Sequence, residues 1–151
     1  MPRRTLATAL ALSVTALGSV LVSGPAEAAG PIQFGRAQYD SPGADTSSNA
    51  SINAEYVVIR NTGTRAVSLT GWTVRDALPA TYKFGTFTLG AGKTVVLRTG
   101  KGTNSATTRY WGMSRYVWNN TGDKALLRNA AGTAVDTCGW TKVGVGYVIC
   151  P

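Results

Sequence analysis

Short apolar segments alternate with turn residues along most of the chain. Segments rich in Val, Ile, Thr, Tyr and Trp are separated by Gly, Pro and Asn, and after residue 29 no stretch keeps the apolar spacing of a helix. The predicted strands are Ile32–Tyr39, Ala54–Arg60, Trp72–Asp76, Thr81–Phe84, Thr94–Thr99, Tyr116–Trp118, Ala125–Arg128 and Ala134–Trp140, with a last extended segment Val145–Cys150. Short strands at this spacing predict an all-β fold, an antiparallel β-sandwich.

The connections between these strands have the composition of turns and loops. Residues 40–53 are rich in Ser, Asn, Gly and Asp, and residues 100–108 are polar and rich in Gly, Ser and Thr, so both are expected to be surface loops. Shorter turns are predicted at residues 61–63, 90–92 and 119–123. No internal repeat or linker divides residues 29–151, which we expect to form one domain.

The N-terminus has the three parts of a secretory signal. Arg3 and Arg4 give a basic start, residues 6–22 carry no charge, and Ala26 and Ala28 supply the small residues of a cleavage site. A membrane anchor is the alternative, but a spanning helix needs about 20 strongly apolar residues, and this stretch is diluted by Ala, Thr, Ser and Gly. We therefore predict a signal peptide over residues 1–28 and a secreted, extracellular protein with no membrane span after cleavage.

The remaining chain is basic and contains two cysteines. The full chain has 15 basic and 7 acidic residues, and residues 1–28 contain Arg3, Arg4 and Glu27. The remaining chain therefore has 13 basic and 6 acidic residues and a formal net charge of +7. This charge favours anionic partners, although no run of Lys and Arg marks a patch. In an oxidising compartment Cys138 and Cys150 are expected to pair. Two free thiols or a metal pair are the alternatives, and the absence of His and of any other Cys argues against a soft-metal site.

The order of several motifs resembles one known family. The motifs are residues 55–63 (EYVVIRNTG), 69–76 (LTGWTVRD), 82–84 (YKF), 87–97 (FTLGAGKTVVL), 117–120 (VWNN), 122–127 (GDKALL) and 132–136 (GTAVD). Together they resemble the lamin tail domain, in the small secreted bacterial type. The resemblance implies an immunoglobulin-like β-sandwich used for surface or matrix interaction. The C-terminal cysteine segment departs from the nuclear lamin pattern, and no coiled-coil heptads are present, so filament and chromatin roles do not follow.

The residue inventory argues against catalysis. The chain has no His, and after residue 28 its carboxylates are Glu55 and five aspartates, Asp40, Asp45, Asp76, Asp123 and Asp136. No nucleophile elbow or phosphate-cradling glycine motif is present. We predict a protein that is not an enzyme and uses no cofactor. The alternative is a hydrolase that places two of these carboxylates in one cleft.

Residues 119–123 have the composition of a weak Ca²⁺ loop. Asn119, Asn120 and Asp123 offer hard oxygen ligands, but Ca²⁺ takes six to eight of them. A β-turn in which Asn and Asp bind their own backbone is the favoured interpretation. We therefore predict no metal site.

The candidate binding site is an aromatic and basic segment. Its residues are Arg109, Tyr110, Trp111, Arg115 and Tyr116. Arginine and aromatic side chains together stack on bases or sugars and pair with phosphates, whereas the alternative is that Tyr110 and Trp111 cover the open end of the sandwich. Trp72 and Trp118 are expected in the core.

Further arginines are scattered along the chain, and outward, solvated strand positions are favoured for them over a common basic face. They are Arg36, Arg60, Arg65, Arg75, Arg98 and Arg128. The predicted function is a non-enzymatic binding or structural module with an unknown protein, cell-wall or anionic-polymer partner. Nucleic acid is the alternative partner, and we expect a monomer.

Overall fold

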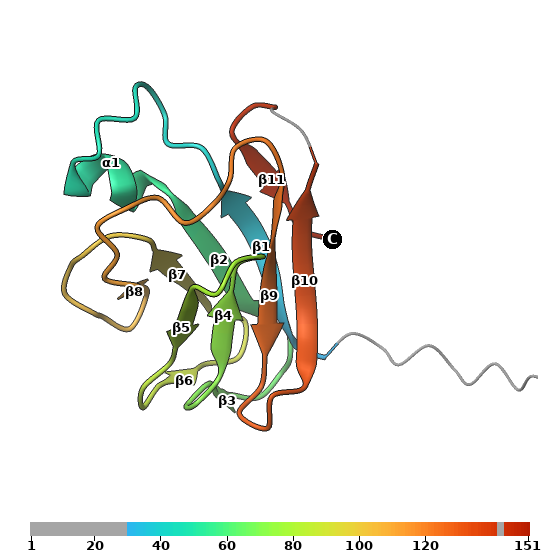
Figure 1. The fold of residues 1–151 in the computed structure, drawn as a ribbon. Helices are drawn as coiled ribbons and strands as arrows, with labels where there is room; N and C mark the ends of the chain where they lie inside the picture. The colour runs from blue at the N-terminus through green and yellow to red at the C-terminus, as the bar shows by residue number, and fades with distance from the viewer. Residues whose placement is uncertain (1–29, 142–143) are drawn as a thin grey trace, which may run out of the picture.

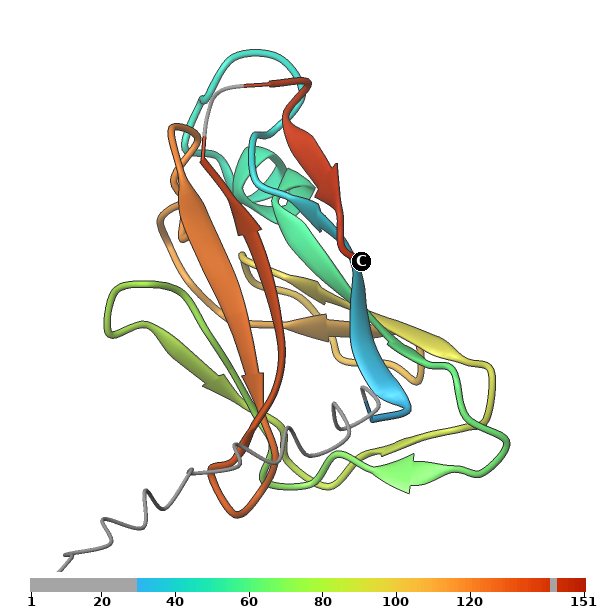
Figure 2. The same ribbon diagram turned by 90° about the vertical axis from the view of Figure 1, so that its right-hand side faces the viewer.

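Two β-sheets packed face to face form the body of the protein. The computed structural model describes residues 30–141 and 144–151, so the predicted signal peptide lies outside the described residues. Figures 1 and 2 show the two sheets as separate layers, with the first and last strands of the chain beside each other. Within the described residues, no helix has the length and apolar character needed to cross a membrane.

The larger sheet has five strands in the order β11-β1-β2-β7-β8. Their bounds are β1 Ile32–Gln38, β2 Tyr56–Asn61, β7 Thr94–Arg98, β8 Thr108–Tyr110 and β11 Tyr147–Ile149. Alternation of buried and partly exposed residues along β2 and β7 shows that one face of this sheet is in the core. All pairs are antiparallel except β7 and β8, which run parallel. The sandwich is therefore antiparallel with one parallel edge.

The second sheet has four strands in the order β10-β9-β4-β5. Their bounds are β4 Thr73–Arg75, β5 Thr81–Lys83, β9 Asp123–Arg128 and β10 Ala134–Trp140. A two-stranded sheet of β3 (Val67–Ser68) and β6 (Thr88–Leu89) lies at one end of the sandwich. The core between the layers is apolar, and its fully buried residues include Phe34, Val57, Ile59, Val74 and Leu127.

A short helix follows the first strand, where the sequence predicted a loop. Helix α1 spans Asn49–Ala54, and the side chain of its N-cap residue Ser48 accepts a hydrogen bond from the Ser51 N–H at 3.2 Å. Only Ile52 of the helix is buried. The prediction of a loop over residues 40–53 was thus wrong in its second half, because a single buried residue leaves no apolar period in the sequence.

One predicted strand was wrong and three short strands were not predicted. Residues 116–118 are irregular backbone, and their place in the sequence of strands is taken by β8, eight residues earlier. Val117 and Trp118 are nevertheless buried, because their N–H groups bind the Glu55 carboxylate at 3.0 and 3.2 Å rather than a neighbouring strand. The sequence predicted neither β8 nor the two-residue strands β3 and β6.

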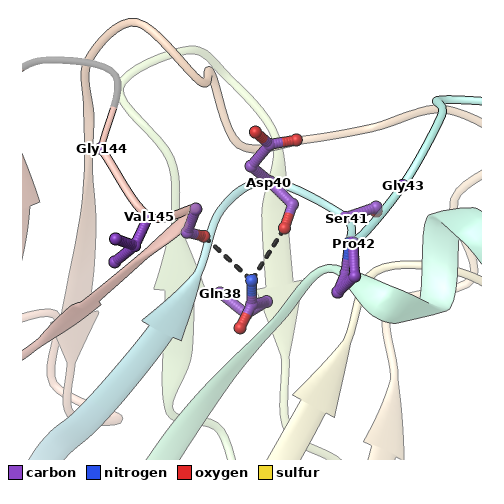
Figure 3. Close-up of a pocket in the computed structure, with 8 residues that line it drawn as sticks. Gln38, Asp40, Ser41, Pro42, Gly43, Gly144 and Val145 are labelled. Atoms are coloured by element: carbon purple, nitrogen blue, oxygen red, sulfur yellow. Dashed lines mark hydrogen bonds between the residues drawn. The ribbon is translucent and has the colours of Figure 1, made fainter.

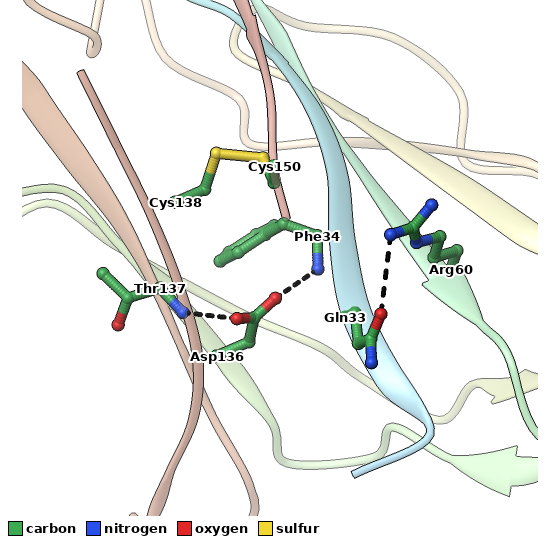
Figure 4. The surroundings of a disulfide bond; sticks show 7 residues. All are labelled: Gln33, Phe34, Arg60, Asp136, Thr137, Cys138 and Cys150. Carbon is green, nitrogen blue, oxygen red and sulfur yellow. Dashed lines mark hydrogen bonds between the residues drawn. A yellow bond between two sulfur atoms is a disulfide. The ribbon is translucent and has the colours of Figure 1, made fainter. Parts of the chain in front are cut away.

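The predicted disulfide is present and closes one side of the sandwich. Cys138 lies in β10 and Cys150 directly follows β11, and the two are bonded with their Cα atoms 5.3 Å apart (Figure 4). The bond connects the larger sheet to the four-stranded sheet. Trp118 belongs to the core as predicted. Trp72 is partly exposed and packs against the core.

Candidate functional site

The five candidate residues of the sequence do not form one surface. Trp111 is packed among aromatic rings, with its ring centroid 6.0 Å from that of Tyr82 and 5.7 Å from that of Trp118. Rings in such tilted and edge-to-face contacts stabilise a core. The same row of rings continues through Trp140 to Tyr39. The position of Trp111 therefore fits the alternative that it covers the end of the sandwich.

The two arginines of the segment face different ways. The guanidinium of Arg109 lies 4.1 Å from the ring centroid of Phe87, a cation–π contact on the core side of β8. Arg115 is exposed, and its Nη1 donates to the carbonyl oxygen of the adjacent Tyr116 at 3.4 Å. These two side chains do not converge on a common ligand position.

The tyrosines of the segment also separate. The hydroxyl of Tyr116 is 2.6 Å from Oγ of Ser51, so this ring connects the segment to helix α1. Tyr110 pairs with Arg98 in the register of β7 and β8, which places it on the outer face of the larger sheet. Its ring packs against Gly102, where a Cβ atom would come within 2.4 Å of the ring. Tyr110 is thus the member of the predicted set that joins the surface described next.

The outer face of the five-stranded sheet carries arginines and tyrosines side by side. The strand register places Gln38 between Tyr147 on one side and Tyr56 on the other. Tyr56 is in turn paired with Arg98, and Arg98 with Tyr110. These five residues form one row across the five strands. Arg36 lies in the next outward row, opposite Val58, and Arg60 lies one row further along β2, opposite Gln33. We call this surface the arginine–tyrosine face, made of Arg36, Tyr56, Arg60, Arg98, Tyr110, Tyr147 and Ile149.

Two of the three guanidinium groups of this face lie over its aromatic rings. Arg36 is 3.9 Å from the ring centroid of Tyr147, and Arg98 is 5.5 Å from that of Tyr56. Arg36 Nη2 donates to Oε1 of Gln38 at 2.6 Å, and Arg98 Nη1 donates to the carbonyl oxygen of Asn53 at 2.6 Å. These contacts fix the side chains, while each guanidinium keeps further N–H donors for a ligand.

The field at this face is positive. The five strands of the sheet contain four arginines and no Asp or Glu. Three of the arginines, Arg36, Arg60 and Arg98, occupy outward positions, and Arg109 points inward. Since no carboxylate of these strands neutralises them, the face attracts anions.

A hollow of about 340 Å³ borders the face at the end of β1 (Figure 3). Gln38 forms its floor, and its Nε2 donates to the carbonyl oxygens of Asp40 at 2.8 Å and Gly146 at 3.1 Å. Pro42 and Val145 contribute to the walls. The amide of Gln38 therefore holds two loops in place beside the arginine–tyrosine face.

Asp76 and Asp123 are brought close together by the fold. Asp76 is buried at 6% exposure, neither of its carboxylate oxygens has a hydrogen-bond partner in the described structure, and its pKa is raised, first by burial and then by the charge of Asp123. The carboxylate of Asp123 accepts hydrogen bonds from the N–H groups of Ala77, Asn119 and Lys124. Three hollows lined by described residues include a single carboxylate, that of Asp40, so the pair does not line them.

The oxygens of the suspected Ca²⁺ loop bind its own backbone. Oδ1 of Asn119 accepts from the N–H of Thr121 at 3.0 Å, and Oδ2 of Asp123 accepts from the N–H of Asn119 at 3.0 Å. Asn120 donates to Oδ1 of Asp40 at 2.9 Å. These contacts are those of the favoured β-turn interpretation. Among residues 30–141 and 144–151, no group of three or more His, Cys, Asp or Glu is placed to hold a metal ion.

The arginine–tyrosine face was not predicted from the sequence. Its arginines were predicted at solvated outward positions. The structure places Arg36, Arg60 and Arg98 outward but half-buried, and their common face was not expected. Part of the signal lies in the period-2 pattern, since Arg60 follows buried Ile59 and Arg98 follows buried Leu97 in the predicted strands. At Arg36 the alternation is broken by the register shift after Phe34. Recognising the face required the pairing of β1 with β2 and of β2 with β7.

Comparison with known proteins agrees with the fold. The family model described as Lamin Tail Domain matches residues 25–142. No curated protein matches the sequence. The match spans most of the chain and covers strands β1 to β10, while β11 lies beyond it. The chain belongs to the lamin tail domain family, and its fold is the immunoglobulin-like β-sandwich of that family.

Proposed function

We propose that this protein is an exported, non-enzymatic binding module, and that its arginine–tyrosine face binds a linear anionic polymer of the cell envelope. The observation that supports the proposal is the outer face of the larger sheet, which carries Arg36, Arg60 and Arg98 in strands without any Asp or Glu. The basic and apolar N-terminal sequence supports export.

The spacing of the arginines favours an extended ligand over a small anion. Neighbouring strands lie about 4.8 Å apart, and Arg36 on β1 and Arg98 on β7 are separated by β2. Their backbones are therefore roughly 10 Å apart, and Arg60 lies four residues along β2 from Tyr56, the ring that both Arg36 and Arg98 adjoin. The three positive charges are thus spread over the face and not gathered at one point. A polymer with one phosphate or carboxylate in each repeat presents charges at such intervals.

The packing of the tyrosines favours a charged glycopolymer over single-stranded nucleic acid. Binding of unpaired bases relies on aromatic rings whose faces are free to stack. Here the Tyr147 ring is covered by the Arg36 guanidinium, and the Tyr56 ring lies below that of Arg98. The rings thus orient the arginines, and the arginines supply the contact with the ligand.

The proposal is tested with poly(glycerol phosphate) as the probe. Because both sheets and the core lie within residues 30–151, the chain from residue 29 onward is the material. Binding is measured by calorimetry over a series of salt concentrations, for the parent and for the double variant Arg36→Gln/Arg60→Gln. We expect the variant to bind at least tenfold more weakly and to show a smaller dependence of affinity on salt, because two contacts with charge are lost.

A matched control separates the face from net charge. The variant Arg65→Gln/Lys93→Gln removes two positive charges at exposed residues outside the strands of this sheet. It should bind like the parent, and an equal loss of affinity in both variants would show that only total charge matters. Tighter binding to a single-stranded DNA oligonucleotide than to poly(glycerol phosphate) would favour the nucleic-acid function instead.

A further inference from the structure

The outer face of the four-stranded sheet is a second basic surface. Its outward positions include Arg75 on β4, Lys83 on β5, and Lys124 and Arg128 on β9, and we call these four residues the lysine–arginine face. In the register, Thr73 lies opposite both Lys83 and Arg128, and Arg75 lies opposite Leu126. The four cations are thus spread over three neighbouring strands of one sheet.

The two carboxylates of this sheet are directed to backbone groups. Asp123 accepts hydrogen bonds from the N–H groups of Ala77 and Asn119, at the end of the sheet where β9 begins. Asp136 accepts from the N–H of Phe34, which belongs to the other sheet. Both carboxylates are therefore engaged away from the outward positions of the lysine–arginine face, and its charge stays positive.

The two basic faces point in opposite directions. In a β-sandwich the inner faces of both sheets form the core, so the outer faces lie on opposite sides of the molecule. Val74 and Leu127 are fully buried between the outward residues of β4 and β9, as Val57 and Ile59 are in β2. Figure 2 shows the two layers that separate the faces. A single polymer segment lying flat on one face does not contact the other.

We infer that the protein bridges two segments of anionic polymer, one on each face, and so cross-links polymer chains. This inference rests on the proposed function of the arginine–tyrosine face and adds the second site and its consequence. The lysine–arginine face has no aromatic residue among its outward positions. It therefore holds the polymer through charge alone, and its binding is the more sensitive of the two to salt.

Cross-linking is measured by light scattering while poly(glycerol phosphate) is titrated with the chain from residue 29 onward. A bivalent protein joins polymer chains at low protein-to-polymer ratios, and an excess of protein covers each chain separately and disperses the clusters. The test variant is Lys83→Gln/Lys124→Gln, in which two exposed side chains lose their charge. The control Arg65→Gln/Lys93→Gln loses the same charge outside both faces.

The parent and the control should show the same maximum in scattering. The variant Lys83→Gln/Lys124→Gln should lose at least half of that maximum, while calorimetry at the same salt concentration still shows binding of the polymer through the arginine–tyrosine face. Scattering equal to that of the parent would overturn the bridging inference and leave the proposed function intact. If the parent itself does not bind the polymer, the proposed function fails, and the inference fails with it.

Discussion

The carboxylate of Asp136 on β10 accepts a hydrogen bond from the N–H of Phe34 on β1 at 2.6 Å, and it thereby joins the two sheets of the sandwich (Figure 4). Both strands shift register at this point, β1 between Phe34 and Arg36 and β10 between Ala134 and Asp136. The edge strand β11 pairs with β1 from Arg36 onward, so the Phe34 N–H is satisfied by a side chain instead of a strand. One carboxylate thus completes the edge of a sheet to which it does not belong.

Replacing Asp136 by Ala should lower the free energy of unfolding by about 1.5–3 kcal/mol, because the Phe34 N–H loses a charged acceptor inside the protein. Urea denaturation measures the change. Asp136→Asn keeps an acceptor oxygen and should cost less than half as much. Thr137→Ala, at an exposed neighbouring position, should be close to neutral. Equal stability of Asp136→Ala and the parent would show that the contact between the sheets contributes nothing.

The disulfide should stabilise the fold because it closes a short loop and so lowers the entropy of the unfolded chain. Cys138 and Cys150 are 12 residues apart, and closing a loop of this length corresponds to about 3 kcal/mol in the chain-entropy model. The double variant Cys138→Ser/Cys150→Ser should therefore unfold at lower urea concentration. The reduced parent should unfold close to the variant, and a midpoint that reduction does not change would contradict the prediction.

The sequence was sufficient for the fold class because the apolar residues alternate within short segments. Val57 and Ile59 on β2 and Val95 and Leu97 on β7 are fully or almost fully buried at every second position. Residues 116–118 are instead a short aromatic and apolar run that resembles a strand in composition, but Val117 and Trp118 are adjacent buried residues of a loop. The carboxyl group of Glu55, 62 and 63 residues away in the chain, accepts hydrogen bonds from the N–H groups of Val117 and Trp118, and no local pattern reveals such a partner.

The candidate surface could not be predicted from the sequence for a related reason. Arg36, Arg60 and Arg98 are far apart in the chain, and only the order β1-β2-β7 brings them together. The segment of residues 109–116 was predicted as the binding site because its aromatic and basic residues are adjacent in the sequence. Adjacent residues in an extended chain point to opposite faces, and this separates Arg109 from Tyr110.

Trp111 and Arg115 should behave differently when each is replaced by Ala. Trp111 packs against Tyr82 and Trp118, so its loss should lower the free energy of unfolding by about 2–4 kcal/mol. Arg115 is exposed, and its loss should change stability by less than about 0.5 kcal/mol. Urea denaturation and binding of poly(glycerol phosphate) are measured for both. A large loss of binding in Arg115→Ala, with stability unchanged, would show that the binding site lies in residues 109–116, as the sequence predicted.

Glu55 should make the protein less stable as the pH rises through neutrality. Its side chain is buried at 1% exposure, and burial raises its pKa from 4.5 to about 8, against the smaller opposing effect of hydrogen bonds from the Val117 and Trp118 N–H groups. Between these two values the folded chain binds a proton that the unfolded chain has released. Stability is therefore highest below pH 4.5 as far as this group is concerned, and it falls as the pH rises toward 8.

The pH dependence is measured by urea denaturation between about pH 4 and pH 9. For one proton the slope approaches about 1.4 kcal/mol per pH unit, and Glu55→Gln should remove this contribution, because an amide does not titrate. The variant should therefore be more stable relative to the parent at pH 8 than at pH 5. Asp76→Asn is the comparison, since Asp76 is also buried with a raised pKa but does not bind the N–H groups of Val117 and Trp118. Parallel profiles for Glu55→Gln and the parent would show that the Glu55 carboxyl has the same pKa in the folded and unfolded chain.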